Sequence, residues 1–187
     1  MEIPGVINNG DDGKVADDFY HRYQEDIDMM KGMGLKHYRF SIAWPRVLPD
    51  GTIENVNNEG VDFYNRVLDS LIAADIEPWV TLYHWDLPSA LHNNTATGGW
   101  LNPEIPEIFN SYADFCFKTF GSRVKHWITI NEPSSIAWLG FGAGVHAPGR
   151  CSPSVNERCA TIGGGGDSSI EPNIVSHHLL LAHGLAV

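Results

Sequence analysis

The feature that most restricts the fold of this chain is a repeated change in the spacing of its apolar residues. They recur at steps of three and four in segments 17–34, 58–74 and 105–121, which predicts three amphipathic helices. Each segment is followed by an alternating or β-rich one, at 36–42, 78–83 and 124–130, which predicts three strands. Helix and strand in regular alternation favour a parallel sheet with right-handed crossovers, so the predicted fold class is α/β.

The rest of the chain adds one helix and one long connection. A loop of about 40 residues is expected after the third strand, a length that is uncommon in a compact domain unless the loop is functional. A final helix is expected from Glu171 to the last residue.

Two parallel architectures fit this order of elements, the doubly wound sheet and the (β/α)₈ barrel. A nucleotide-binding doubly wound sheet carries a Gly-rich phosphate turn directly after a strand. The single Gly cluster, Gly163–Gly166, lies in the long loop and has no Lys-Ser or Lys-Thr after it, so we interpret it as a surface turn.

Each predicted strand ends in a cluster of polar and aromatic residues. The three clusters span residues 39–45, 84–88 and 131–133. Barrel enzymes assemble their sites at the carboxyl ends of the strands, so three such clusters in succession favour the barrel.

Composition excludes several classes of protein. The chain has 187 residues and a net charge of −11, whereas a nucleic-acid or anionic membrane partner would require a basic surface. No stretch approaches the roughly 18 apolar residues of a membrane-spanning helix, and the first 20 residues are too polar for a signal peptide. A length of 187 by itself suggests one ordinary domain.

Glu132 and Asn131 are the first candidate site residues. Glu132 follows an apolar strand, where partial desolvation would raise the pKa of its carboxyl, as a general acid near neutral pH requires. Asn131 offers both a donor and an acceptor for a sugar hydroxyl. In a regular strand the two side chains point to opposite faces, so we expect a break in the pleat, such as a bulge. The alternative is that Asn-Glu-Pro only ends a strand and starts a turn.

The other two strand ends supply further candidates. His84 and Trp85 are suited to binding the hydroxyl edge and covering the apolar face of a pyranose, or they are an ordinary rim histidine beside a core tryptophan. Trp44 is also a site candidate, while Trp79 and Trp127, inside strands, are expected in the core. Arg39 alternates with aromatic residues, so we expect it to point into a barrel and to pair with a carboxylate.

Metal and cysteine patterns give weaker signals. No metal site is predicted, since the nine His are scattered and no Cys-x-x-Cys or His-Glu-x-x-His occurs. Cys116 lies on a helical stripe and is expected to be a buried thiol. Cys151 and Cys159 are spaced for a local disulfide, or are two free thiols of a cytosolic protein. The disulfide and the sequon at Asn93 favour a secreted, vacuolar or lumenal compartment.

Together these motifs resemble glycoside hydrolase family 1, the β-glucosidase family, and its plant-type members in particular. The resemblance runs from about residue 17 to the end and predicts an incomplete catalytic barrel domain over 17–187, with a poorly determined segment at 1–16. It corresponds to about strands two to four of a partial (β/α)₈ barrel, their helices and the start of the next unit. The motifs that carry it include Arg39–Pro45, His84–Pro88, Thr129–Pro133 and Ala147–Cys151. Asn-Glu-Pro also resembles other barrel glycosidases, whereas His84–Pro88 together with Arg39–Ser41 points to family 1.

The resemblance implies a role for each candidate. Glu132 is implied as the acid/base of a retaining hydrolysis of β-glycosides, and Asn131 as the residue that holds the 2-hydroxyl. His84 and Trp85 are implied as parts of the glycone site, and Arg39 as the arginine that steadies the nucleophile. No cofactor is implied, and the partner is a small-molecule β-glycoside; the oligomeric state stays open.

The chain also departs from the family. The nucleophile of the family lies in a Thr-Glu-Asn-Gly-like segment that this sequence lacks, the first strand with its sugar-binding Gln is missing, and Asn173 stands where plant-type members usually have Tyr. Asp86 is a nearby carboxylate that we interpret as structural. We therefore expect a truncated gene product or an incomplete gene model that is inactive and poorly soluble alone. The alternatives are a non-catalytic remnant that binds sugar or nothing, and a different barrel glycosidase of the cellulase kind.

Overall fold

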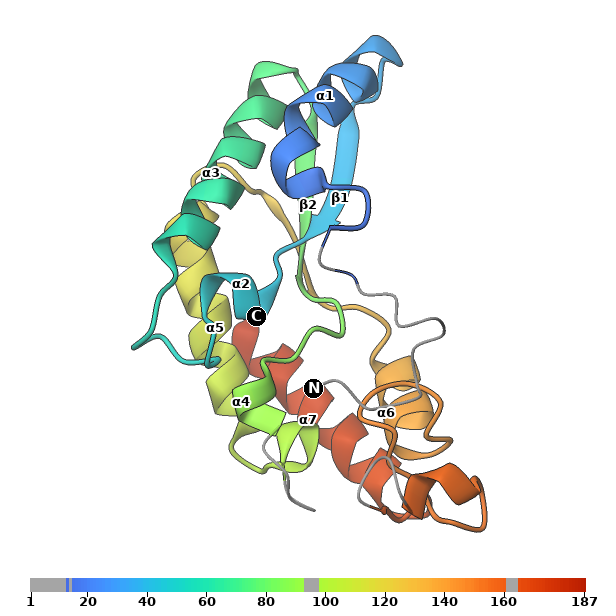
Figure 1. Ribbon diagram of the computed structural model, residues 1–187. Coiled ribbons are helices and arrows are strands. Elements are labelled where there is room, and N and C mark those ends of the chain that lie inside the picture. Colours follow the sequence, from blue (N-terminus) through green and yellow to red (C-terminus); the bar gives the residue numbers. More distant parts are fainter. Residues whose placement is uncertain (1–12, 14, 93–97, 161–164) are drawn as a thin grey trace.

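A three-stranded parallel sheet forms the centre of the protein (Figure 1). The computed structural model describes residues 13, 15–92, 98–160 and 165–187. The strands lie in chain order: β1 (His37–Ser41), β2 (Glu77–Tyr83) and β3 (His126–Ile130). The predicted α/β class and parallel sheet are confirmed, and all three strands lie within the predicted segments to within one residue.

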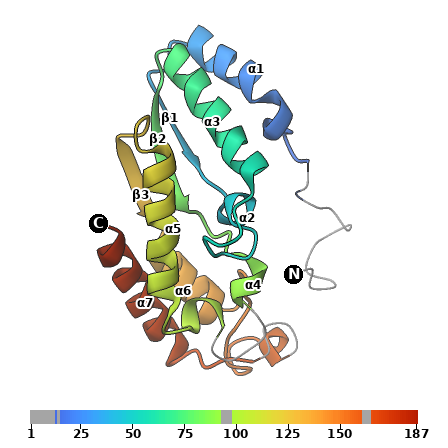
Figure 2. The same cartoon turned by 90° about the vertical axis from the view of Figure 1, so that its left-hand side faces the viewer.

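Long helices connect and flank the strands. Among the described residues the four helices longer than ten residues are α1 (Phe19–Gly32), α3 (Asn58–Ala73), α5 (Ile105–Phe120) and α7 (Glu171–Ala186). Helices α3 and α5 run along the same side of the sheet (Figure 2). Shorter helical segments are α2 (Trp44–Val47), α4 (Ser89–His92), η2 (Gly99–Leu101), α6 (Pro133–Phe141) and η3 (Glu157–Ala160).

The core lies between the sheet and the helices α3 and α5. Val80 and Leu82 of β2 are fully buried there, together with Val67 of α3 and Phe109 of α5. Because side chains alternate along a strand, the residues of β2 that alternate with Val80 and Leu82 face the other way, towards the concave side of a barrel wall.

Trp79 is one of these concave-side residues, and its predicted place in the core is wrong. Its side chain is 38% exposed and stacks on the ring of His126, with ring centroids 4.1 Å apart. The strand register pairs Trp79 with His126, which accounts for this contact. Trp127, one residue further along β3, is part-buried and packs edge-on against Phe117 of α5, as a core residue would.

The long loop predicted after β3 is also wrong in part, because it contains helix α6. This helix has Pro133 at its first position, where the missing N–H of proline costs nothing. Its residues Ile136 and Phe141 are buried. The Gly cluster is described only at Gly165 and Gly166, and Gly165 has the positive φ of +81° that a turn with glycine accommodates.

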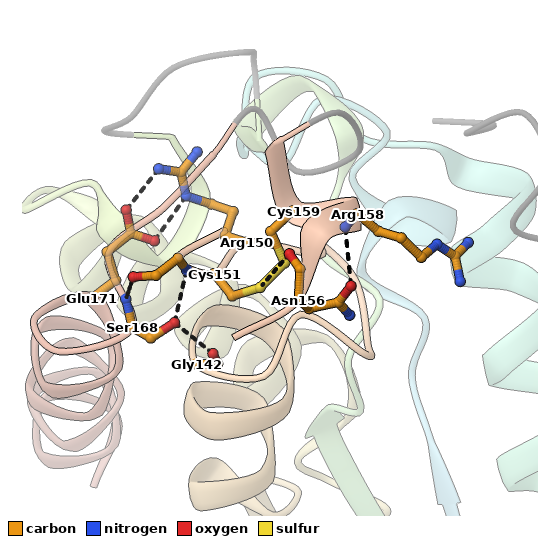
Figure 3. Close-up of a disulfide and its surroundings, with 9 residues drawn as sticks. Gly142, Arg150, Cys151, Asn156, Arg158, Cys159, Ser168 and Glu171 are labelled. Carbon is orange, nitrogen blue, oxygen red and sulfur yellow. Dashed lines mark hydrogen bonds and ion pairs between the residues drawn. A yellow bond between two sulfur atoms is a disulfide. The ribbon is translucent and has the colours of Figure 1, made fainter. Parts of the chain in front are cut away.

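Beyond α6 the chain is fastened by covalent and polar links (Figure 3). The predicted Cys151–Cys159 disulfide is confirmed, and Cys116 is the buried free thiol that was expected. Next to the disulfide, Arg150 and Glu171 form a buried two-pronged ion pair, with N–O distances of 2.9 and 2.7 Å. These links hold the loop after α6 against the first turn of α7.

Some predicted features fall outside the described residues. The sequon at Asn93 does so, and most of the segment 1–16 does too. Within the described part of the chain, no helix combines the length and apolar character needed to cross a membrane.

Candidate active site

The carboxyl ends of the three strands meet at one edge of the sheet. β1 ends at Ser41, β2 at Tyr83 and β3 at Ile130, and the register pairs Tyr83 with Ile130. The polar clusters that follow the strands are therefore brought to one place, as the barrel interpretation requires.

Asn131 is the centre of this cluster, with a side chain that is only 8% exposed. Its backbone N–H donates to the carbonyl of Tyr83 at 2.9 Å, which extends the pairing of β3 with β2 by one residue. Its Oδ1 accepts from Nη2 of Arg39 at 2.5 Å, and its carbonyl accepts from Nε1 of Trp85 at 2.9 Å. One residue thus joins candidates from all three strand ends.

Arg39 lies on the concave side of β1, as predicted, but the carboxylate partner expected for it is wrong for the described part of the chain. Its Nη2 donates to Asn131, and its Nε donates to Oγ1 of Thr81 at 3.2 Å. Neutral acceptors are sufficient here because Arg39 is exposed and water satisfies the remaining N–H groups. An open groove of about 470 Å³ in front of this guanidinium is lined in part by Thr81 and His84.

Glu132 leaves the strand with a left-handed backbone, at φ 47° and ψ 62°, and caps helix α6. The expected break in the pleat between Asn131 and Glu132 is present, although it is made by this conformation rather than by a bulge. A left-handed residue other than glycine costs roughly 1–2 kcal/mol, which the surrounding hydrogen bonds must offset. Glu132 is exposed in the described structure, so the predicted partial desolvation is wrong for this chain.

Trp85 is the second left-handed residue of the site, at φ 76°. Its indole is 37% exposed, and it lies near the rings of His84 and His146, with centroids at 6.1 and 5.1 Å. His146 was missed by the sequence reasoning. It belongs to the loop after α6, and no local pattern marks it as a neighbour of a residue 61 positions earlier.

Trp44, in contrast, is not part of the site. It is fully buried and stacks on Tyr112 of α5, with centroids 4.5 Å apart and planes 4° from parallel. Its Nε1 donates to the carbonyl of Gly51. Helix α2 begins at Trp44 and turns the side chain into the core, which the position at a strand end did not reveal.

Asp86 has the structural role predicted for it. Its two carboxylate oxygens accept from the backbone N–H groups of Trp44 at 3.1 Å and of His84 at 3.3 Å. Burial raises the pKa of the Asp86 carboxyl, and the backbone hydrogen bonds oppose that shift. A carboxylate committed to two amides is poorly placed to attack a sugar.

Within the described residues, no set of three or more His, Cys, Asp or Glu side chains has an arrangement that could hold a metal ion.

A parallel α/β wall with an amide, a carboxylate and aromatic side chains at its strand ends defines a segment of a (β/α)₈ barrel. The family comparison agrees: the family model for glycosyl hydrolase family 1 matches residues 1–187, and the chain belongs to that family.

Plant β-glycosidases are among the relatives of this chain. It is 51% identical over 187 residues to β-glucosidase 26 of Oryza sativa subsp. japonica, covering 34% of that protein, and 50% identical to an isoflavonoid 7-O-β-apiosyl-glucoside β-glycosidase of Dalbergia nigrescens, covering 33%. A rice β-glucosidase of known structure matches 99% of the chain with a TM-score of 0.92 and 48% identity. The match covers 37% of that structure, so the chain spans about a third of the length of these relatives.

Proposed function

We propose that this chain carries the acid/base side of a retaining β-glucosidase site. The observation that carries the proposal is the position of Asn131, which is hydrogen-bonded to Arg39 on one side and Trp85 on the other, with Glu132 next to it in the chain. Family membership supports the reaction class, because the relatives named above are β-glucosidases or β-glycosidases.

Each residue has a distinct task in the proposed reaction. Glu132 protonates the glycosidic oxygen as the bond breaks, and afterwards its carboxylate takes a proton from the attacking water. Asn131 uses Oδ1 to accept from Arg39, which leaves its Nδ2 to donate to a sugar hydroxyl. Trp85 uses its N–H within the protein, so its exposed ring face is left for the apolar face of the sugar. His84 supplies a polar edge at the same rim.

The second carboxylate of a retaining enzyme attacks the sugar and forms a covalent glycosyl-enzyme. A rice relative has been solved as a mutant in a covalent complex with Glc, which supports this route for the family. We do not assign the nucleophile to Asp86, because both of its oxygens accept from backbone amides. The 187 residues contain no segment like that of the family nucleophile, so we expect them to hydrolyse little or nothing by themselves.

The test uses the longest form of the protein that the transcript encodes, with an aryl β-glucoside as substrate. We expect Glu132→Gln to lower kcat/KM by about 10²- to 10⁴-fold, the usual contribution of general acid–base catalysis. Azide should restore turnover of Glu132→Ala and give a β-glucosyl azide, because a small anion can replace base-activated water. The matched control is Glu54→Gln, an exposed loop carboxylate away from the strand ends.

Three other outcomes would contradict the proposal. Turnover that survives Glu132→Gln would remove the assigned acid/base. Sugar binding without hydrolysis would favour a non-catalytic remnant. Cleavage of cellulose chains without cleavage of small aryl glucosides would favour a cellulase-like enzyme.

A further inference from the structure

Asp86 connects two turns that follow neighbouring strands. One of its oxygens accepts from the N–H of His84, just after β2, and the other from the N–H of Trp44, at the end of the segment that follows β1. The carboxylate therefore joins backbone positions 40 residues apart at the edge where the candidate site lies.

The Trp44 end of this link is rigid. The indole of Trp44 is fully buried against Tyr112, whose hydroxyl donates to the carbonyls of Leu82 and Ile42 at 2.8 and 3.3 Å. The neighbouring N–H of Ala43 donates to the hydroxyl of Tyr64 at 2.7 Å. This end is thus fixed to helices α3 and α5 through two buried side chains.

The other end is exposed and strained. His84 and Trp85 are both exposed, and Trp85 holds a left-handed backbone that side chains other than glycine rarely adopt. The Nε1 of Trp85 donates to the carbonyl of Asn131, and its indole lies near the ring of His146. A strained, exposed turn keeps one geometry only when its surroundings determine it.

We propose that Asp86 is a positioning residue of the active site, which holds His84 and Trp85 in place for the sugar by anchoring their turn to the buried Trp44. This inference rests on the proposed function, because it gives Asp86 a role in the same glycone site. Asp86 itself does not touch the substrate; it acts through His84 and Trp85.

The geometry calls for a carboxylate and not for an amide. Two N–H donors approach two different oxygens, and a carboxylate accepts at both. Asparagine has nearly the same shape, but its NH₂ group would face one of the two N–H donors. Asp86→Asn therefore breaks one half of the link at almost constant volume.

The first test is a double-mutant cycle in the longest encoded form of the protein, measured with an aryl β-glucoside. We expect Asp86→Asn to lower kcat/KM by about tenfold or more, since small displacements of binding groups are costly in active sites. In the His84→Ala, Trp85→Ala background the same change should cost less than about twofold, because the side chains through which Asp86 acts are gone. The matched control is Asp114→Asn, an exposed carboxylate on α5.

The second test needs no activity and uses the 187-residue chain. Amide hydrogen exchange should accelerate by about tenfold in Asp86→Asn at whichever of Trp44 and His84 loses its acceptor, while exchange within β3 stays unchanged. Equal losses of kcat/KM in both backgrounds, or faster exchange throughout the sheet, would show that Asp86 only stabilises the fold and would overturn the inference. If the complete protein hydrolyses no glycoside, the proposed function fails. The exchange measurement still tests whether Asp86 joins the backbones of His84 and Trp44. Unchanged exchange at both amides would refute the link itself.

Discussion

A single buried hydroxyl serves the ends of two strands. Tyr112 lies on α5, is fully buried, and donates towards the carbonyls of Leu82 and Ile42. Burial raises the pKa of this phenol well above its ordinary value, so the hydroxyl keeps its proton and stays a donor. The carboxyl ends of β1 and β2, where the candidate site begins, are therefore held together by the side chain of Tyr112 on α5.

Removing the Tyr112 hydroxyl should lower the free energy of unfolding while leaving the packing of the ring almost unchanged. We expect Tyr112→Phe to lower the free energy of unfolding by about 1–3 kcal/mol, because a buried carbonyl loses its donor. Urea unfolding of the 187-residue chain, followed by tryptophan fluorescence, measures the change. Tyr23→Phe is the control, since the hydroxyl of Tyr23 makes no hydrogen bond to any residue in the described ranges. Equal losses in both variants would contradict the assigned role of Tyr112.

At the residue scale, the sequence predicted which residues lie close together better than it predicted the environment of each side chain. The polar clusters at strand ends predicted that Arg39, Trp85 and Asn131 would meet, because the ends of parallel strands share an edge. The partner of Arg39 and the burial of Trp44 could not be predicted. The burial of Trp44 depends on the direction the chain takes after β1, which helix α2 sets and which has no periodic signal over four residues. The partners of Arg39 lie 42 and 92 positions later in the chain, in β2 and just after β3, and no local pattern marks them.

At the scale of elements, the connection between α6 and α7 depends on a small number of links. The disulfide closes a short loop, and Ser152 and Ser168 donate backbone N–H groups to each other's hydroxyls at 2.8 and 3.0 Å. The hydroxyl of Ser168 also donates to the carbonyl of Gly142, one residue after α6 (Figure 3). Loop and helix therefore behave as one packed unit, which supports α7 against α5 and α6.

Removing one partner of the buried Arg150–Glu171 ion pair should lower the free energy of unfolding. Glu171→Leu takes away the carboxylate that accepts from Nε and Nη2 of Arg150, and we expect a loss of about 3–5 kcal/mol in the free energy of unfolding. Replacing both residues, as Arg150→Met with Glu171→Leu, should cost much less, since no charge is then left buried beside a missing partner. Chemical denaturation of the unmodified chain and of these two variants checks this. A double variant as unstable as Glu171→Leu would show that side-chain shape, and not charge, determines the loss.

The sequence predicts the long helices and strands with a clear apolar period well, and the short or uniformly apolar ones poorly. The stripes of α1, α3 and α5 span about four turns each, so their apolar spacing locates them even when the ends differ by a few residues. Helix α6 was missed because its nine residues are apolar on most sides and include Gly140, which removes the one-sided stripe. Its packing against α7, more than 30 residues later in the chain, supplies the stability that its own sequence pattern did not indicate.

For the whole molecule, the sheet and the helices α6 and α7 leave surface that a complete barrel would cover. Within the described residues β1 and β3 each pair only with β2, so both have an open edge of unpaired N–H and C=O groups. Apolar side chains are exposed on α6 and α7, where Trp138 is 56% and Leu180 66% exposed, next to Leu181 and Leu185. The net charge of −11 opposes association, because two copies of the chain repel each other.

The balance between these two effects can be shifted with salt. We expect the 187-residue polypeptide, expressed alone, to associate in a concentration-dependent way, and to do so more strongly as ionic strength rises. Salt shortens the screening length from about 30 Å at roughly 0.01 M to about 3 Å at roughly 1 M, which removes the repulsion but leaves open edges and apolar surface unchanged. Light scattering coupled to size-exclusion chromatography at several concentrations measures the mass.

Two variants locate the cause of association. Leu180→Lys with Leu185→Lys changes the exposed face of α7 and should lower the associated fraction, whereas Ile53→Lys, an exposed residue in the loop after α2, should not. If the α7 variant associates as strongly as the unmodified chain while Ile53→Lys also has no effect, the open edges of β1 and β3 are the remaining cause. A monomer at every concentration and salt level would contradict this prediction. It would show that neither the open strand edges nor the exposed face of α7 drives association, and that charge repulsion is not what keeps the chains monomeric.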